Sequence, residues 1–148
     1  MLAWIARVVD VAMREPAPSY RPGVIDASFM AHLVPLSPCE EGLQLAGKFL
    51  HHNGIRLVIE PHLNRTRLDG AVIMTRDGAP IIGMTLRHDR VDNFWFTLCH
   101  DLGLVALRLR AGGVEELARR LSLHPALVGG GFVRREVVSV LWTDRRPV

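Results

Sequence analysis

The chain has 148 residues, of which 49% are hydrophobic and 22% are charged, and its formal net charge is +3. This length suits one domain with a sizeable core, and a mean hydropathy of +0.18 excludes a mostly disordered chain. The longest stretches without a charged residue, 27–39 and 121–133, contain proline and fall short of the roughly 18–20 apolar residues of a membrane span.

The sequence also indicates the cellular compartment. The N-terminus has neither the basic start nor the cleavage site of a signal peptide. Two cysteines, Cys39 and Cys99, are too few for a disulfide scaffold or a four-cysteine zinc site. We therefore expect one cytoplasmic domain over residues 1–148, with no membrane contact.

The basic residues permit two interpretations. All but one of the 18 are arginine, the exception being Lys48, and acidic residues stand close to many of them. A GC-rich genome that favours arginine codons produces this pattern, and so does a protein with an anionic partner such as nucleic acid. A net charge of +3 by itself gives only weak electrostatic steering.

The first fifty residues are predicted to be helical. Apolar residues at helical spacing predict a helix over residues 2–14, and the proline-rich segment 16–23 predicts a turn. A short helix is expected over 25–34. Ser37, as an N-cap followed by proline, predicts a third helix that runs to Asn53 and is closed by Gly54.

The middle of the chain changes to strand character. Residues 55–59, 70–75 and 80–86 are predicted strands, and Asp77-Gly78 predicts a hairpin between the last two. We expect a small antiparallel sheet from these strands. Helices around such a sheet make an α+β fold.

A long central helix is expected over residues 92–108, with Asp92 as its N-cap. Its apolar residues run nearly all round, which predicts that it exposes little surface and lies against the sheet. One stripe comprises Phe96, Cys99, Gly103 and Leu107, and Trp95, Leu98 and Leu102 lie beside it. A further helix is expected over 114–121, whereas residues 132–142 suit either a helix or a strand.

The central helix contains His100-Asp101-Leu102-Gly103-Leu104. A zinc metallopeptidase helix carries His-Glu-x-x-His, because two histidines four residues apart share one helix face and the glutamate activates the bound water. Here only His100 stands where a zinc ligand is needed. Asp101 replaces the glutamate, and Leu104 replaces the second histidine.

The residues around this motif resemble one family. Residues 82–98 read IGMTLRHDRVDNFWFTL, with Leu68-Asp69-Gly70 before them and His100 after them. This pattern is similar to the ImmA/IrrE-type metallopeptidase-like domain, in the branch attached to Cro/C1-type antitoxins and regulators. The matching positions are Arg87, Asp89, Arg90, Asp92, Asn93, Trp95 and Phe96. The resemblance covers residues 37–136, and residues 1–36 form a helical N-terminal extension.

The resemblance implies a zincin-like α+β fold in which the metal site is incomplete. One of three family ligands, His100, aligns, and Asp101 is a vestigial counterpart of the catalytic acid. The segment that carries the family's third ligand is missing before Glu115. We therefore expect a catalytically inactive peptidase-like module without a cofactor. Its expected setting is bacterial, in a toxin–antitoxin system or in transcription regulation.

The expected partner is a protein, namely a Cro/C1-type regulator, a toxin or a second copy of the chain. Two alternatives stay open. One is an atypical zinc peptidase that uses His100 with relocated ligands chosen from His88, Asp101 and His62. The other is a basic nucleic-acid-binding module, although the helix-turn-helix-like residues 117–128 run into three glycines, which disfavour a recognition helix.

A charged run precedes the central helix and is the remaining candidate binding site. Arg87, His88, Asp89 and Arg90 either clamp an anion or a peptide at the rim of a cleft, or form ion pairs that fix the corner between strand and helix. The neighbouring Cys99 is not expected to be a nucleophile paired with His100, because adjacent helical residues point about 100° apart.

Overall fold

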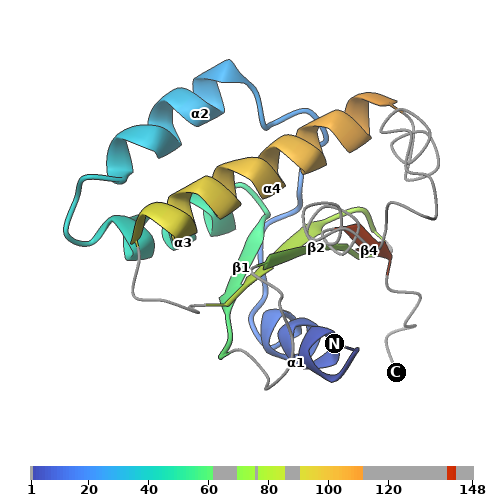
Figure 1. Cartoon of the computed structure of the whole chain (residues 1–148). Coiled ribbons are helices and arrows are strands. Elements are labelled where there is room, and N and C mark those ends of the chain that lie inside the picture. The colour runs from blue at the N-terminus through green and yellow to red at the C-terminus, as the bar shows by residue number, and fades with distance from the viewer. Residues whose placement is uncertain (1, 62–69, 76, 86–90, 112–139, 143–148) are drawn as a thin grey trace, which may run out of the picture.

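A computed structural model describes residues 2–61, 70–75, 77–85, 91–111 and 140–142 of the chain (Figure 1). The described elements, in chain order, are helices α1 (Leu2–Met13) and α2 (Ala27–Leu33), the 3-10 helix η1 (Val34–Leu36), helix α3 (Gly42–His52), strands β1 (Arg56–Ile59), β2 (Gly70–Met74) and β3 (Pro80–Met84), helix α4 (Val91–Ala111) and strand β4 (Val140–Trp142). The predicted α+β class is confirmed. The charged run 87–90 and the predicted helix over 114–121 lie outside the described residues.

The sheet is mixed, so the prediction of an antiparallel sheet is wrong. Its strand order is β1-β3-β2-β4. Only β2 and β3 are antiparallel, whereas β1 is parallel to β3 and β4 is parallel to β2. Turn residues specify a hairpin between two consecutive strands, but they do not determine to which edge of that hairpin an earlier strand adds.

The β2–β3 hairpin itself is confirmed and is closed by local hydrogen bonds. Gly78 has φ 81°, a conformation that glycine adopts without strain. The Thr75 amide donates to the Ala79 carbonyl at 2.9 Å, and the Ala79 amide donates to the Thr75 hydroxyl at 3.0 Å. The Asp-Gly signal therefore identified the turn for the right physical reason.

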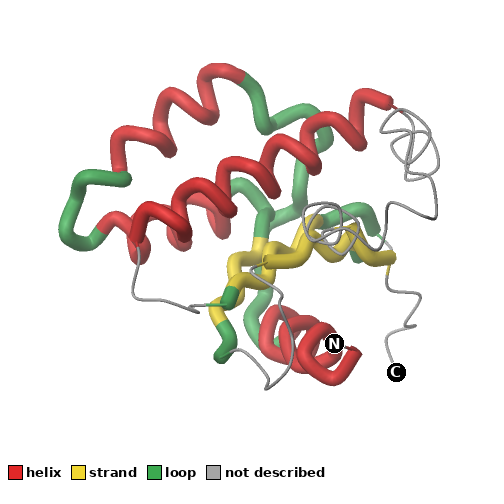
Figure 2. Tube along the Cα trace, in the orientation of Figure 1, coloured by secondary structure: helices red, strands yellow, loops and turns green. Residues whose placement is uncertain are grey.

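The sheet separates two hydrophobic cores, because successive side chains of a strand point to opposite faces. On one face α1 packs with Trp4 and Val8 against Ile73 and Ile81. On the other face lie α2, α3 and α4, with residues such as Leu50, Val72, Ile82, Leu98 and Leu102. Figures 1 and 2 show α1 alone on its side of the sheet, and the linker after α1 crossing to the helices on the other side.

Gly83 of β3 sets the close approach of α1. A Cβ at this position would lie 2.8 Å from a Val8 methyl carbon and 3.0 Å from the Trp4 ring. Contacts this short do not occur between unstrained atoms, so a side chain at position 83 would push α1 off the sheet.

Local capping explains the start of α2 and the end of α3, but not the start of α3. Asp26 caps α2 by accepting a hydrogen bond from the Phe29 amide at 2.8 Å. Gly54, with φ 78°, closes α3 as predicted. The predicted start of α3 at Ser37 is wrong, because the Ser37 amide donates to the Val34 carbonyl and so ends η1. The helix begins at Gly42 instead.

The long helix α4 exists, but the prediction that it exposes little surface is wrong for one stripe. Phe96 is 74% exposed and Leu107 is 53% exposed, so this stripe faces away from the core. The buried stripe contains Leu98, Leu102 and Val105. Both stripes are apolar in sequence, so periodicity alone does not tell which one packs. The helix also begins at Val91, which places Asp92 in its first turn rather than at the N-cap.

None of the helices within the described ranges combines the length and the apolar character that crossing a bilayer needs.

Candidate functional site

His100 and Asp101 lie in the middle of α4 and differ sharply in exposure. The Asp101 side chain is 1% exposed and faces the sheet, whereas the His100 side chain is 34% exposed. The Nδ1 atom of His100 lies 3.2 Å from Oδ1 of Asp101, within hydrogen-bonding distance. The two residues that the sequence singled out therefore form a contacting pair.

The carboxylate of Asp101 fits over a glycine of the neighbouring strand. A Cβ at Gly70 of β2 would lie 2.9 Å from Asp101 Oδ2 and 3.0 Å from the Thr97 methyl carbon. The absence of a side chain at position 70 thus makes room for the carboxylate between α4 and β2. Gly70 belongs to the sequence pattern that resembles the family, but no role was predicted for it. The available signal for such a role was that Gly70 directly follows an aspartate and begins a strand.

Asp101 is an under-satisfied buried acid. Its Oδ2 atom has no hydrogen-bond partner among the described residues. Desolvation by burial raises the pKa of this carboxyl group, and the hydrogen bond and charge of His100 lower it to a smaller extent. Such a group opposes folding when it is ionised, and buried acids of this kind are over-represented at functional sites.

The fit of these residues to a zinc ion is poor. A catalytic zinc takes three protein ligands and one open position. Leu104, one helical turn after His100, is 8% exposed and carries no donor atom. In the parts of the chain that the structure describes, no group of three or more His, Cys, Asp or Glu residues is placed to hold a metal ion.

Several predicted site residues fall outside the described ranges. Arg87, His88, Asp89 and Arg90 belong to residues 86–90, and His62 belongs to residues 62–69. The clamp and ion-pair interpretations of this run, and the relocated metal site, therefore stay predictions. Cys99 is half-buried and desolvation raises the pKa of its thiol, which disfavours the thiolate that a nucleophile needs.

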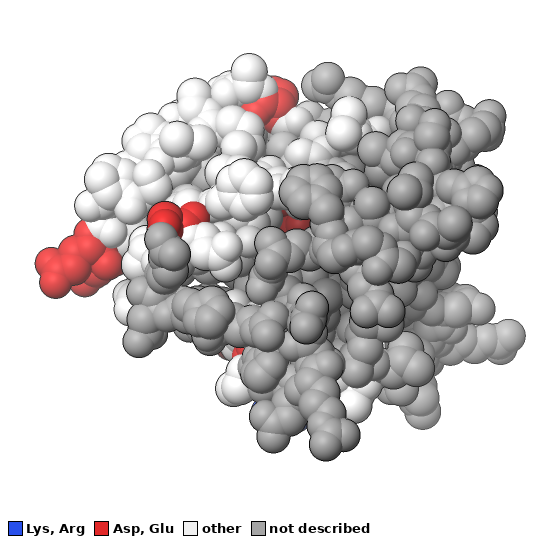
Figure 3. Space-filling view, viewed as in Figure 1, with Lys and Arg blue, Asp and Glu red and all other residues white. Residues whose placement is uncertain are grey.

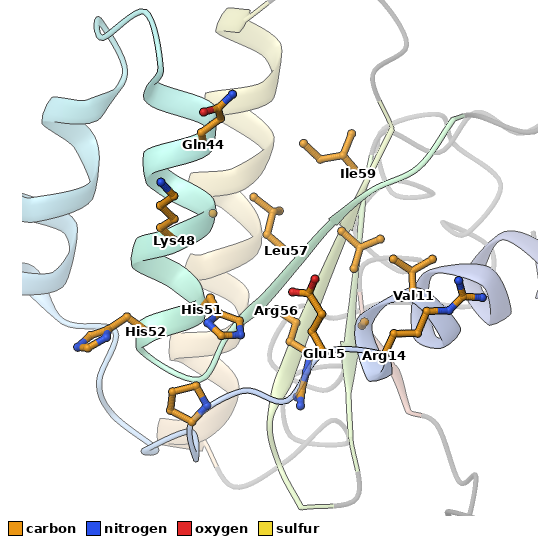
Figure 4. Close-up of a pocket in the computed structure, with 14 residues that line it drawn as sticks. Val11, Arg14, Glu15, Gln44, Lys48, His51, His52, Arg56, Leu57 and Ile59 are labelled. Carbon is orange, nitrogen blue, oxygen red and sulfur yellow. The ribbon is translucent and has the colours of Figure 1, made fainter.

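A second concave site, which sequence analysis missed, lies along β1. It is an open groove of about 730 Å³ between the end of α1, helix α3 and β1. Figure 4 shows Lys48 and His51 on α3 at one side of β1, and Arg14, directly after α1, at the other. His51 and His52 are the last two residues of α3, and His51 Nε2 lies 3.1 Å from the Pro16 carbonyl oxygen. No sequence pattern revealed the groove, because its walls come from separate segments.

On the face of the molecule shown in Figure 3, the described lysine and arginine side chains do not form a basic patch. Acidic side chains stand out there near the turn before α3, where Glu40 and Glu41 are exposed, and lysine and arginine scarcely show. This view gives no support to a nucleic-acid interface on the described surface of that face, since such interfaces need clustered cations.

Comparison of the chain with models of known protein families, with characterised proteins and with solved structures finds no match to any of them.

Proposed function

We propose that this protein is a catalytically inactive, zincin-like relative of the ImmA/IrrE-type metallopeptidase domain that acts as a cytoplasmic binding or regulatory module. Its partner is a protein in a bacterial toxin–antitoxin or transcription-regulator setting, namely a Cro/C1-type regulator, a toxin or a second copy. The observation that carries the proposal is the α4 face on which His100 is followed, one turn later, by the buried Leu104.

The direction of Asp101 supports the loss of catalysis. A general base must come within hydrogen-bond reach of the water that it activates. The Asp101 carboxylate is instead 1% exposed, packs over Gly70 and contacts His100 with its other oxygen. A water bound on the solvent side of His100 would not reach it.

The packing of α4 supports retention of the fold without the chemistry. Asp101 sits among the apolar residues that hold α4 on the sheet, including Leu98 and Leu102. Leu104 is buried as well. A helix that keeps its packing while it loses a ligand position is what a binding module derived from a metallopeptidase needs.

The direct test is metal content together with partner cleavage. We expect untagged protein purified from zinc-containing medium to hold far less than one zinc per chain. We also expect it to form a stable complex, seen by light scattering, with a regulator or toxin encoded beside it, and to leave that partner uncleaved. Stoichiometric zinc together with chelator-sensitive cleavage of the partner would contradict the proposal.

The second candidate is an atypical metallopeptidase, and the buried, pKa-shifted Asp101 beside His100 favours it. It predicts that His100→Ala abolishes zinc retention while the far-UV circular dichroism stays unchanged. A matched His52→Ala variant, at the exposed end of α3, would keep the zinc. Equal and negligible zinc in all three proteins removes this candidate.

A further inference from the structure

The groove along β1 contains an open sheet edge. In the strand order β1-β3-β2-β4, β1 pairs with β3 alone among the described strands. Helix α1 borders one side of this edge and α3 the other (Figure 4). Pro18 of the linker lines the groove too and lies against Gly54, just before β1 begins. An unpaired edge is a template for another strand unless it is covered.

The register identifies the backbone groups that point outward. The Glu60 amide donates to the Met84 carbonyl of β3 at 3.0 Å. In a parallel ladder the residues that bond to one neighbour alternate with those that face away from it. Arg56, Val58 and Glu60 therefore face β3, whereas Leu57 and Ile59 direct their amides and carbonyls to the groove.

The side chains around this edge combine apolar surface with unpaired positive charge. Ile59 is 39% exposed, and Leu57 is partly buried beside it. Lys48 and Arg56 line the groove and form no ion pair within the described residues. Arg56 Nε is also buried, and no described residue forms a hydrogen bond with it.

Acidic groups in the groove do not balance these cations. Glu15 is the acidic residue that lines it, and Arg14, which also lines it, is paired with Asp10 at 2.6 Å. A second copy docking edge to edge would bring its own Lys48 and Arg56 against the same groups, which like-charge repulsion disfavours. The charge therefore selects an anionic occupant.

We propose that the β1 groove binds an extended, acidic peptide segment of another protein, which adds to β1 as a further strand. Main-chain hydrogen bonds to Leu57 and Ile59 supply the affinity, and carboxylates near Lys48 and Arg56 supply the specificity. The inference rests on the groove alone and does not depend on the peptidase-like origin of the His100–Asp101 pair.

The test uses the full chain and three labelled peptides of about eight residues, a common strand length. The first alternates glutamate and valine, the second alternates lysine and valine, and the third is the first with N-methyl groups along one edge. Fluorescence anisotropy at low salt reports binding. We expect the glutamate peptide to bind, with an affinity that falls as salt rises, and the other two to bind at least about tenfold more weakly.

Protein variants separate the backbone from the charge. Ile59→Pro removes one outward amide that forms no hydrogen bond with β3, and we expect it to weaken binding of the glutamate peptide about tenfold. Ile59→Ala keeps that amide, and we expect it to keep most of the binding. Lys48→Glu is expected to weaken binding about fivefold. Arg21→Glu makes the same change of net charge at an exposed position outside the groove, and should leave binding unchanged.

Several results would overturn the proposal. Equal binding of the glutamate and lysine peptides removes the charge argument, and full binding of the N-methylated peptide removes strand addition. No binding of the glutamate peptide at millimolar concentration also overturns it. A dimer in solution that Ile59→Pro dissociates would assign the edge to a second copy instead. Should Ile59→Pro not fold, the N-methylated peptide and Lys48→Glu decide on their own.

Discussion

Two regions of the molecule carry charged side chains in opposite environments. One is the contact of α4 with β2, and the other is the groove along β1, on the opposite side of β3. At the first, one carboxylate is enclosed against Gly70 with an oxygen left unsatisfied. At the second, Lys48 and Arg56 line an open groove and form no ion pair within the described residues. A closed charged site opposes folding and is inaccessible to a partner, whereas an open one costs little and is available for binding.

The largest expected difference between the two regions is the effect of a glycine substitution on the free energy of unfolding. Gly70→Ala places a Cβ 2.9 Å from Asp101 Oδ2, and we expect it to destabilise the protein by about 1–3 kcal/mol. Gly47→Ala, in the interior of α3 beside the groove, meets no atom within 4 Å. It should stabilise the protein by about 0.5–1 kcal/mol, because alanine favours a helix more than glycine does.

Urea unfolding of both variants against the unchanged chain measures these differences. A lower unfolding free energy for Gly70→Ala and a higher one for Gly47→Ala would support the difference between the enclosed contact and the open groove. If Gly70→Ala is as stable as the unchanged chain, the carboxylate does not occupy the space over β2 that the structure gives it.

The next largest effect concerns the charge of Asp101. Its raised pKa means that the folded state holds this proton more tightly than the unfolded state. The stability of the unchanged chain should therefore fall as the pH rises from about 3.8 through the folded-state pKa, and remain lower above it. Asp101→Asn removes the charge, and we expect it to stabilise the protein at neutral pH by about 1–2 kcal/mol.

Chemical denaturation across the pH range checks both the sign and the size of this effect. Asp10→Asn is the matched control, because Asp10 is exposed in α1 and pairs with Arg14. It should change stability by less than about 0.5 kcal/mol. A neutral Asp101→Asn variant that is less stable than the unchanged chain would show that the ionised carboxylate supports the fold.

Local signals in the sequence were sufficient for much of the secondary structure. Gly54 ends α3, Asp77-Gly78 makes the hairpin, and the breaker segment after α1 separates the first two helices, all as predicted. Each of these features depends on the conformational preference of one or two residues. The position of His100 and Asp101 on the central helix was predicted as well, but the contact between their side chains was not.

Features set by tertiary packing were not predictable from the sequence. Phe96 and Leu98 are both apolar, and only the position of the sheet decides that Leu98 is buried while Phe96 is exposed. The parallel pairing of β1 with β3 depends on a connection whose course no turn residue specifies. The groove has the same origin, since it exists only because β1 lies at an edge between two helices.

The smallest expected effect concerns the linker at the end of the groove. It is measured as the absorbance of a tyrosine, and it leaves the stability at neutral pH unchanged. Tyr20 is the single tyrosine of the chain, and its backbone packs against Gly54, where the linker passes the end of α3. Desolvation by burial raises the pKa of Tyr20 to about 12 from 10.0. The phenolate absorbance of the folded protein should therefore rise with a midpoint near pH 12, and in urea with a midpoint near pH 10. Because the unfolded state loses this proton first, stability should fall as the pH rises from 10 to 12. A folded-state midpoint near 10 would mean that the linker does not pack against the end of α3 and does not border the groove where β1 begins.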